Sequence, residues 1–274
     1  MEIKDKDIVV WFGAGAASAI AAKKTVELYG KDNRITVINS PILEEHEDNR
    51  RFVKDVEEWI QHPIIEARNK DFPNASIMEV FKKRRYISGI EGAPCTKVLK
   101  KEARYQYEAE HNIDWHVLGF TIDEYQRQKR FNLNEKENTL AVLISLMIEK
   151  ADCFNILKKA GIKRPIVYEL GLPNANCLGC VKATSPTYWN LIRKIAPDKF
   201  LALSILSREL GVRLVRVKGK RIFLDELKET DNGAPIKSWD CGVFCDMGAT
   251  RPTNVDGMKS KRTASDELST YTED

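Results

Sequence analysis

The chain has 274 residues, with 44 Lys or Arg against 40 Asp or Glu, so its formal net charge at pH 7 is +4. It is 43% hydrophobic, and no apolar run reaches the roughly 18 residues that a membrane helix needs. These values exclude a wholly disordered chain and a membrane-spanning helix, and they predict one large or two small globular domains. The charged amino terminus does not resemble a signal peptide, so we expect a cytoplasmic protein.

The first part of the sequence alternates between short β-branched runs and helical patterns. Strands are predicted at residues 6–12, 34–39, 63–67, 113–120 and 140–144, and helices at 16–29, 47–61, 96–111, 123–130 and 149–160. This alternation predicts an α/β fold with a parallel sheet and right-handed crossovers.

The pattern changes from Pro165 onward. A loop rich in Gly, Pro and Asn surrounds the first cysteine pair, and residues 186–210 predict a helix broken near Pro197. Residues 212–223 form a β-like run of alternating basic and apolar side chains. After residue 250 the sequence is polar and lacks periodic apolar positions, which predicts a flexible tail.

A turn of small residues, Gly13 to Ser18, connects the first predicted strand to the first predicted helix. Small residues let backbone N–H groups approach an anion, and the helix start adds its positive dipole end. The turn lacks the Lys of a Walker loop and the spacing of a dinucleotide fingerprint, so tight strand–helix packing is the alternative. The candidate anion-binding residues are Gly13, Ala14, Gly15, Ala17 and Ser18.

Four of the six cysteines form two closely spaced pairs, Cys177 with Cys180 and Cys241 with Cys245. Four thiolates in two such pairs are the ligand set of a tetrahedral zinc site or of a 4Fe-4S cluster. The spacing does not choose between zinc and iron, and separate thiols without metal are the alternative.

The other two cysteines differ in their surroundings. Cys95 precedes Thr96 and Lys97 at a predicted helix start, where the helix dipole and a lysine favour a reactive thiolate. It is the candidate catalytic residue, with a further metal ligand or a structural thiol as alternatives. Cys153 lies among apolar residues of a predicted helix and is expected in the core.

Polar and basic residues follow the strand predicted at 113–120. Ligands of α/β folds bind at the carboxyl ends of strands, so Thr121, Arg127 and Arg130 are candidate phosphate-binding residues. Other basic groups occur at Lys97, Lys100, Lys101 and Arg104, and at Arg213, Arg216, Lys218, Lys220 and Arg221. These groups could also hold phosphate, with a solvated helix face as the alternative for the first of them.

Five segments between residues 7 and 185 occur in an order that resembles the phosphoadenosine phosphosulfate (PAPS) reductase family of the adenine nucleotide alpha hydrolase superfamily. These segments are the turn Phe12 to Ser18, Cys95-Thr-Lys, Gly119 to Arg127, a strand and short helix ending in Gly at Ser145 to Gly161, and Pro165-Ile-Val-Tyr-Glu-Leu-Gly171 followed by Cys177-Leu-Gly-Cys180.

This resemblance implies a Rossmann-like sheet of about five strands with helices on both faces, which binds an adenine nucleotide at the strand ends. It places Asn39 and Ser40 near the adenosine and Gly119 in the nucleotide-binding strand end. It favours a 4Fe-4S cluster over zinc. The implied organisation is a nucleotide-binding domain at 1–165, a helical segment with metal-binding cysteines at 166–250, and the tail at 251–274.

The leading hypothesis for function is a PAPS reductase-like iron-sulfur enzyme, an oxidoreductase or transferase that performs sulfonucleotide reduction or sulfur transfer on an adenine nucleotide. A thiol electron donor and a homodimer are partners that the resemblance allows. The first alternative is an ATP-dependent enzyme that adenylates tRNA or DNA before thiolation, with residues 213–221 along the phosphate backbone. The second alternative is a non-catalytic nucleotide- or nucleic-acid-binding module with a structural metal.

Overall fold

The structure is a computed structural model that describes residues 3–89 and 92–236. The second cysteine pair, Cys241 and Cys245, and the predicted tail lie outside the described residues. None of the helices in the described ranges has the length and apolarity needed to cross a membrane.

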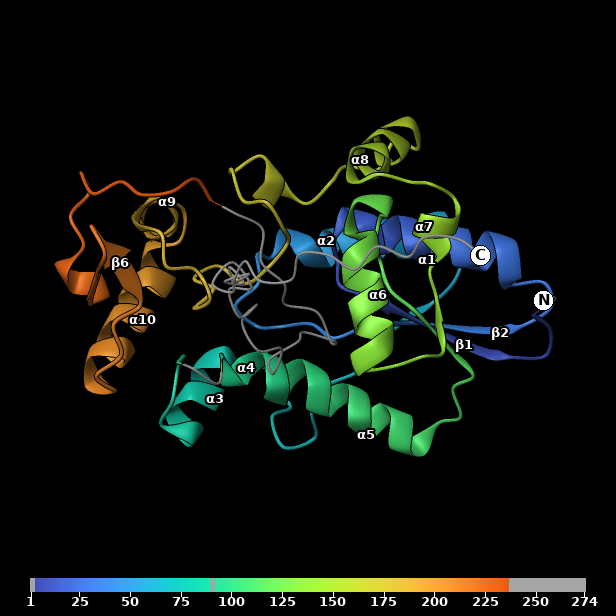
Figure 1. The fold of residues 1–274 in the computed structure, drawn as a ribbon, viewed down its shortest axis with the longest axis horizontal. Coiled ribbons are helices and arrows are strands. Elements are labelled where there is room, and N and C mark those ends of the chain that lie inside the picture. The colour runs from blue at the N-terminus through green and yellow to red at the C-terminus, as the bar shows by residue number, and fades with distance from the viewer. Residues whose placement is uncertain (1–2, 90–91, 237–274) are drawn as a thin grey trace, which may run out of the picture.

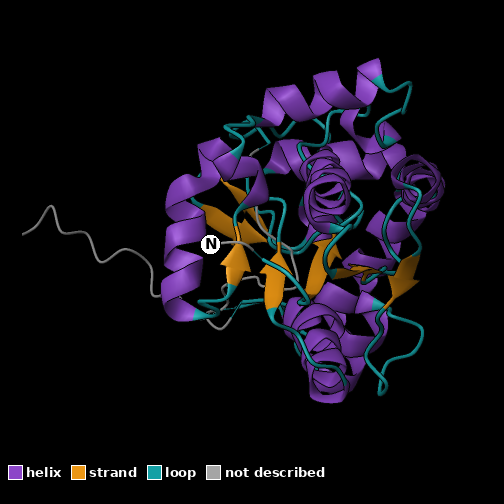
Figure 2. Ribbon diagram, turned by 90° about the vertical axis from the view of Figure 1, so that its right-hand side faces the viewer, coloured by secondary structure: helices purple, strands orange, loops and turns teal. Residues whose placement is uncertain are grey.

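A parallel sheet of five strands forms the centre of the amino-terminal part (Figures 1 and 2). Its strands are β1 (Asp7–Phe12), β2 (Arg34–Asn39), β3 (Ile64–Glu66), β4 (Trp115–Val117) and β5 (Thr139–Leu140), in the order β3-β2-β1-β4-β5. The register pairs Phe12 with Asn39 and Val10 with Val117, and all neighbours are parallel. This order and direction confirm the predicted Rossmann-like sheet.

Helices cover both faces of this sheet. The helices in chain order are α1 (Ala16–Tyr29), α2 (Asp48–Ile60), α3 (Ile77–Arg84), α4 (Pro94–Thr96), the π-helix η1 (Lys97–Glu102), α5 (Ala103–Glu110), the 3₁₀ turn η2 (Ile122–Glu124), α6 (Tyr125–Asn134), α7 (Val142–Ser145), α8 (Lys150–Lys159), the 3₁₀ turn η3 (Ile166–Tyr168), α9 (Pro186–Ile195), α10 (Pro197–Glu209) and the 3₁₀ turn η4 (Leu224–Glu226). Apolar residues of α1, α2, α7 and α8 pack on one sheet face, and residues of α5 and α6 pack on the other.

A further hydrophobic cluster lies beyond the sheet and joins segments that are remote in the sequence. It contains Phe81 of α3 and Leu99 of η1 together with Trp189 of α9 and Leu203 of α10. The short antiparallel hairpin of β6 (Val215–Val217) and β7 (Lys220–Ile222) packs against the same cluster. The carboxyl-terminal region therefore shares its core with residues of the amino-terminal half, and the predicted boundary at residue 165 stays a prediction.

Two local expectations were wrong. Residues 140–144 were expected as a strand, but β5 ends at Leu140 and residues 142–145 form α7. Val142 and Leu143 are buried in the core, and a short apolar run cannot be assigned to strand or helix by periodicity alone. The helix expected at 96–111 is interrupted by a π-helical segment, and α3 was not predicted.

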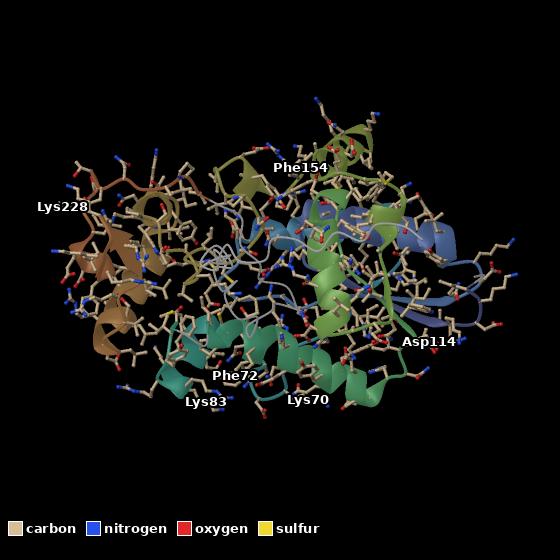
Figure 3. All side chains as sticks on the ribbon, in the orientation of Figure 1. Lys70, Phe72, Lys83, Asp114, Phe154 and Lys228 are labelled. Atoms are coloured by element: carbon tan, nitrogen blue, oxygen red, sulfur yellow. The ribbon has the colours of Figure 1, made fainter. Side chains whose placement is uncertain are left out.

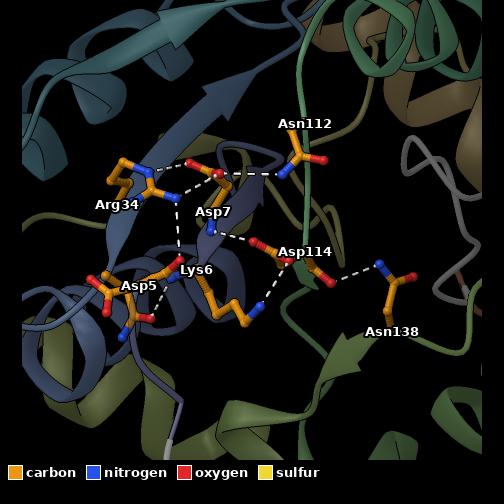
Figure 4. Close-up of polar contacts among 8 residues, drawn as sticks. Asp5, Lys6, Asp7, Arg34, Asn112, Asp114 and Asn138 are labelled. Atoms are coloured by element: carbon orange, nitrogen blue, oxygen red, sulfur yellow. Dashed lines mark hydrogen bonds and ion pairs between the residues drawn. The ribbon is translucent and has the colours of Figure 1, made fainter.

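Polar contacts join the amino ends of four strands (Figure 4). Arg34 of β2 binds the Asp7 carboxylate of β1 through Nε and Nη2, at 2.7 and 2.9 Å. The backbone N–H of Asp7 donates to the Asp114 carboxylate at 2.9 Å, and Asn138 donates to the Asp114 carbonyl at 2.8 Å. These contacts fix the register of β1, β2, β4 and β5 at the edge opposite to their carboxyl ends.

A buried histidine lies between the sheet and α5. Trp11 Nε1 donates to His116 Nδ1 at 3.1 Å, so the other ring nitrogen carries the proton of the neutral ring. The Glu108 carboxylate, 3.9 Å from Nε2, favours the charged ring. Burial, aided by Lys136 and Arg104, outweighs this attraction and lowers the pKa of His116 to about 4.

We therefore expect the His116→Gln variant to lose part of its acid sensitivity. In the unfolded chain a histidine binds its proton near pH 6.5, whereas folded His116 resists protonation until about pH 4, so stability falls as the pH falls through this window. The full contribution is about 3 kcal/mol. Urea unfolding across this window should show a flatter pH profile for His116→Gln, while the control His62→Gln keeps the profile of the parent chain. Equal slopes for the two variants would contradict the assignment.

Candidate functional site

The candidate site lies where the sheet changes its winding direction. The chain proceeds from β1 to β2 and β3 on one side, and then places β4 on the other side of β1. Ligands of open α/β sheets bind beside such a switch point, at the carboxyl ends of the strands. Here the two loops are the turn Gly13 to Ser18 after β1 and residues 118–121 after β4.

The two loops are in close contact. A Cβ atom built on Gly119 would lie 2.7 Å from the Ser18 backbone nitrogen and 2.8 Å from the Ser18 Cα, so only glycine fits there. Gly13, in contrast, has no atom within 4 Å of such a Cβ. The structure thus brings the predicted turn and the predicted Gly119 together. Packing requires glycine at position 119, whereas the described residues leave space for a side chain at position 13.

The turn itself has an unusual backbone. Ala14 is buried and has a φ of +51°, a left-handed conformation that costs a non-glycine residue about 1 kcal/mol. The N–H groups of Gly13 and Gly15 both point at Ser18 Oγ, at 3.2 and 3.3 Å. The two N–H groups thus converge on one oxygen, and Ser18 Oγ in turn donates to the Gly15 carbonyl at 3.0 Å.

Tyr168 of η3 covers this turn from the other side. Its hydroxyl lies 3.5 Å from the Ala16 backbone nitrogen, at the first residue of α1. Its ring makes an edge-on contact with Phe154 of α8, labelled in Figure 3, with ring centroids 5.2 Å apart. Burial raises the pKa of Tyr168, so its hydroxyl stays protonated and can donate a hydrogen bond.

Asn39 and Ser40 lie at the carboxyl end of β2, beside the turn. Asn39 Nδ2 donates to the Phe12 carbonyl at 2.8 Å and joins the ends of β1 and β2. Ser40 Oγ is buried and has no hydrogen-bond partner among the residues that the structure describes. A buried hydroxyl without a partner is costly, so this atom is a candidate contact for a bound ligand.

The predicted residues beyond β4 are placed differently. Thr121 is buried, and its hydroxyl contacts the Asp123 carboxylate at 3.4 Å. Arg127 forms an ion pair with Glu124, and its guanidinium stacks on Phe120 at 4.7 Å. Arg130 is exposed on α6. The role of Arg127 and Arg130 in neutralising an anion stays a prediction.

The first cysteine pair lies in a buried loop. Cys177 and Cys180 are each 6% exposed, and Gly179 between them adopts a φ of +86°. The Tyr188 hydroxyl accepts the N–H groups of Gly179 and Cys180 at 3.1 and 2.6 Å, which fixes the turn between the two thiols. Burial, with both cysteines nearby, raises the pKa of Tyr188 well above its ordinary value.

Glu44 connects this cysteine loop to the loop after β2. Its backbone carbonyl accepts the N–H of Leu178 at 3.0 Å and Lys199 Nζ at 3.0 Å. Its buried carboxylate accepts Ser76 Oγ at 2.7 Å and the N–H of Ile77 at 2.9 Å, at the start of α3. The cysteine loop therefore lies beside the carboxyl end of β2. The contacts of Glu44 were not predicted, because no residue near Glu44 in the sequence indicates its partners.

The other two cysteines of the described chain, Cys95 and Cys153, lie in different surroundings. Cys95 is half-buried in α4 and packs against the hydrophobic cluster that contains Cys177 and Cys180. Cys153 is fully buried in α8, and burial raises its pKa to about 12, as expected for a core thiol. Within the described ranges, no three Cys, His, Asp or Glu side chains group together as a metal site. The buried thiols of Cys177 and Cys180 lie on one turn and fit two of the four predicted metal ligands.

Comparison with known proteins gives distant likenesses in structure and none in sequence. No protein-family model and no curated protein matches the sequence. The structure is similar to phosphoadenylyl-sulfate (PAPS) reductase from Candida auris, with 12% identity and a TM-score of 0.47 over 62% of this chain and 80% of that one. It is also similar to the U34-tRNA thiolase NcsA from Methanococcus maripaludis with its [4Fe-4S] cluster, with 13% identity and a TM-score of 0.42 over 91% and 84%.

The contrast between Gly119 and Gly13 provides a test of the site. Because a methyl group at Gly119 meets the backbone of Ser18, Gly119→Ala should lower stability by about 1–3 kcal/mol and weaken nucleotide binding at least 10-fold. Gly13→Ala has space for its methyl group and should leave stability within about 0.5 kcal/mol. Thermal unfolding and calorimetric titration with adenine nucleotides measure both effects. Equal affinity in all three proteins would contradict the placement of the site.

Proposed function

We propose that this chain is an iron-sulfur enzyme that binds an adenine nucleotide at the carboxyl ends of β1, β2 and β4 and performs sulfonucleotide reduction or sulfur transfer. The observation that carries the proposal is the contact of Gly119 with Ser18 at the switch point, together with two buried cysteines in a loop that is hydrogen-bonded to Glu44 after β2. A nucleotide site and a thiol-rich site are thereby joined through the loop after β2.

The residues of the turn bind the anionic end of the nucleotide in this proposal. Phosphate or sulfate oxygens replace Ser18 Oγ as the acceptor of the Gly13 and Gly15 N–H groups, and the start of α1 adds its positive dipole end. The protonated hydroxyl of Tyr168 donates a further hydrogen bond to the phosphate or sulfate. Ser40 Oγ meets the adenosine, which satisfies the buried hydroxyl, and Arg127 neutralises remaining charge.

The four cysteines 177, 180, 241 and 245 would hold the cluster. Their thiolates suit a 4Fe-4S cluster, which supplies electron transfer or sulfur binding when it is bound. In sulfonucleotide reduction a thiolate attacks the sulfate sulfur, a sulfur–sulfur bond forms, and the sulfur–oxygen bond to the nucleotide monophosphate breaks. Cys95 is the candidate nucleophile, and a thiol donor then releases sulfite from it by forming a disulfide.

The composition of the turn favours a sulfonucleotide over ATP. ATP pyrophosphatases of the superfamily carry Ser-Gly-Gly-x-Asp-Ser, whereas Gly13 to Ser18 lacks the first Ser and the Asp. An acidic side chain that could hold Mg²⁺ for release of pyrophosphate is therefore missing from the turn. Loss of a nucleotide monophosphate from an adenylated sulfate does not require that release.

A second candidate function is ATP-dependent modification of a nucleic acid. The observation that favours it is the basic β6–β7 hairpin, which is hydrogen-bonded to the segment that follows Cys180 through Arg216 N–H and the Thr184 carbonyl at 2.9 Å. A polynucleotide bound there would lie beside the cysteine loop.

Metal analysis of the full chain tests the cluster. Anaerobically purified protein should contain about four iron and four sulfide per chain, and Cys177→Ala should lose most of both. Cys153→Ala is the matched control, because it removes a buried thiol outside the cysteine loop and should keep the metal. One zinc per chain and no sulfide would contradict the iron-sulfur assignment.

Turnover assays test the reaction itself. With a reduced thiol donor, the parent chain should release sulfite from an adenylated sulfate, and Cys95→Ala should lower kcat by at least 100-fold. Nucleotide affinity should be unchanged in Cys95→Ala, because the thiol does not hold the phosphate. Absence of sulfite together with adenylation of RNA or DNA by ATP would favour the second candidate.

A further inference from the structure

We propose that the β6–β7 hairpin is a docking surface for the phosphodiester backbone of a nucleic acid. The inference deepens the second candidate function by naming the surface that its substrate contacts, and it rests on that candidate. In Figure 1, β6 lies at the end of the molecule remote from the N-terminus, and Figure 3 shows Lys228 at that end and Asp114 at the other.

The hairpin has an apolar face and a basic face. Val215 is fully buried, and Val217 and Ile222 pack against the carboxyl-terminal core. Because side chains alternate across a strand, Arg216 and Arg221 point to the opposite face, away from this core. Lys218 and Gly219 form the tip, with φ values of +46° and +84° that fit a two-residue hairpin turn.

The basic face places like charges directly opposite each other. Arg216 and Arg221 are partners in the register of β6 and β7, a pairing that is destabilising for two cations. Burial and the charge of Arg216 lower the pKa of Arg221. An anion bound above this pair would neutralise the two charges and offset the cost in folding free energy.

Carboxylates do not neutralise this face within the described residues. The nearest acidic side chains in sequence bind other cations: Glu209 binds Arg85 at 2.9 Å, and Asp225 and Glu226 bind Arg208 at 2.6 and 3.2 Å. No ion pair involving a cation of the hairpin occurs in the described part of the chain; these cations are Arg213, Arg216, Lys218, Lys220 and Arg221, and all five are exposed. Arg213 is held in place by stacking on Phe223 at 4.7 Å.

The chemistry of the face selects a phosphodiester backbone over a lipid surface. Membrane binding needs exposed large apolar side chains beside the cations, and none of these occurs between residues 212 and 223. A two-stranded ribbon with cations on one face fits a groove of a duplex, or runs along a single strand. The hydrogen bond from Arg216 to Thr184 sets this ribbon beside the cysteine loop.

Fluorescence anisotropy with labelled oligonucleotides of about 20 nucleotides tests the proposal. The test variant of the full chain is Arg216→Ala/Lys218→Ala/Arg221→Ala, and the control is Lys31→Ala/Lys54→Ala/Lys82→Ala, which removes three exposed lysines elsewhere. Single-stranded RNA, single-stranded DNA and duplex DNA are the three probes. Thermal unfolding confirms that both variants are folded, and Arg216→Thr, which removes the like-charge contact, should melt no lower than the parent chain.

We expect the hairpin variant to bind at least one probe 10-fold or more weakly than the control. The slope of log K against log salt should also fall by about 2–3, as for the loss of three phosphate contacts. Equal affinities for the two variants, or no binding by the parent chain at low salt, would overturn the proposal. Nucleotide titration of the same proteins separates this failure from failure of the nucleotide site, because adenine nucleotide binding should be equal in all of them.

Discussion

The buried carboxylate and carbonyl of Glu44 connect the two halves of the candidate site. This residue accepts hydrogen bonds from the start of α3, from the cysteine loop and from Lys199 of α10. The shortest bond from each of the three is 3.0 Å or less. Hydrogen bonds to a charged group contribute about 1.5–3 kcal/mol each. Because Glu44 lies in the loop that follows β2, these bonds fix the carboxyl-terminal region relative to that loop.

The winding of the sheet imposes the second constraint. Placing β4 next to β1 forces the turn of residues 13–18 against the loop after β4, and this contact requires glycine at position 119. Asp7, Arg34 and Asp114 join the amino ends of the same strands. The loops of the candidate site lie at the opposite, carboxyl ends. The end of β2 and the loop after it contact both the end of β1, through Asn39, and the cysteine loop, through Glu44.

Local patterns in the sequence predicted most of the sheet and its helices. The strand at 34–39 and the helix at 16–29 were predicted with their observed bounds, because each has an uninterrupted apolar pattern and a clear end. The strand expected at residues 140–144 was wrong, because so short an apolar run has no period that separates strand from helix. The hydrogen bonds of Glu44 and Tyr168 could not be predicted, since their partners lie 32 to 155 residues away and only the packed chain brings them together.

The central claim is that the nucleotide lies between the turn after β1 and the loop that carries Ser40 and Glu44. Photo-crosslinking with an 8-azido-adenine nucleotide, followed by peptide mapping of the full chain, tests it most directly. The account predicts label on peptides that contain residues 39–45 or 118–121, and loss of that label when unlabelled nucleotide competes. Competable label confined to the β6–β7 hairpin or to α10 would contradict it.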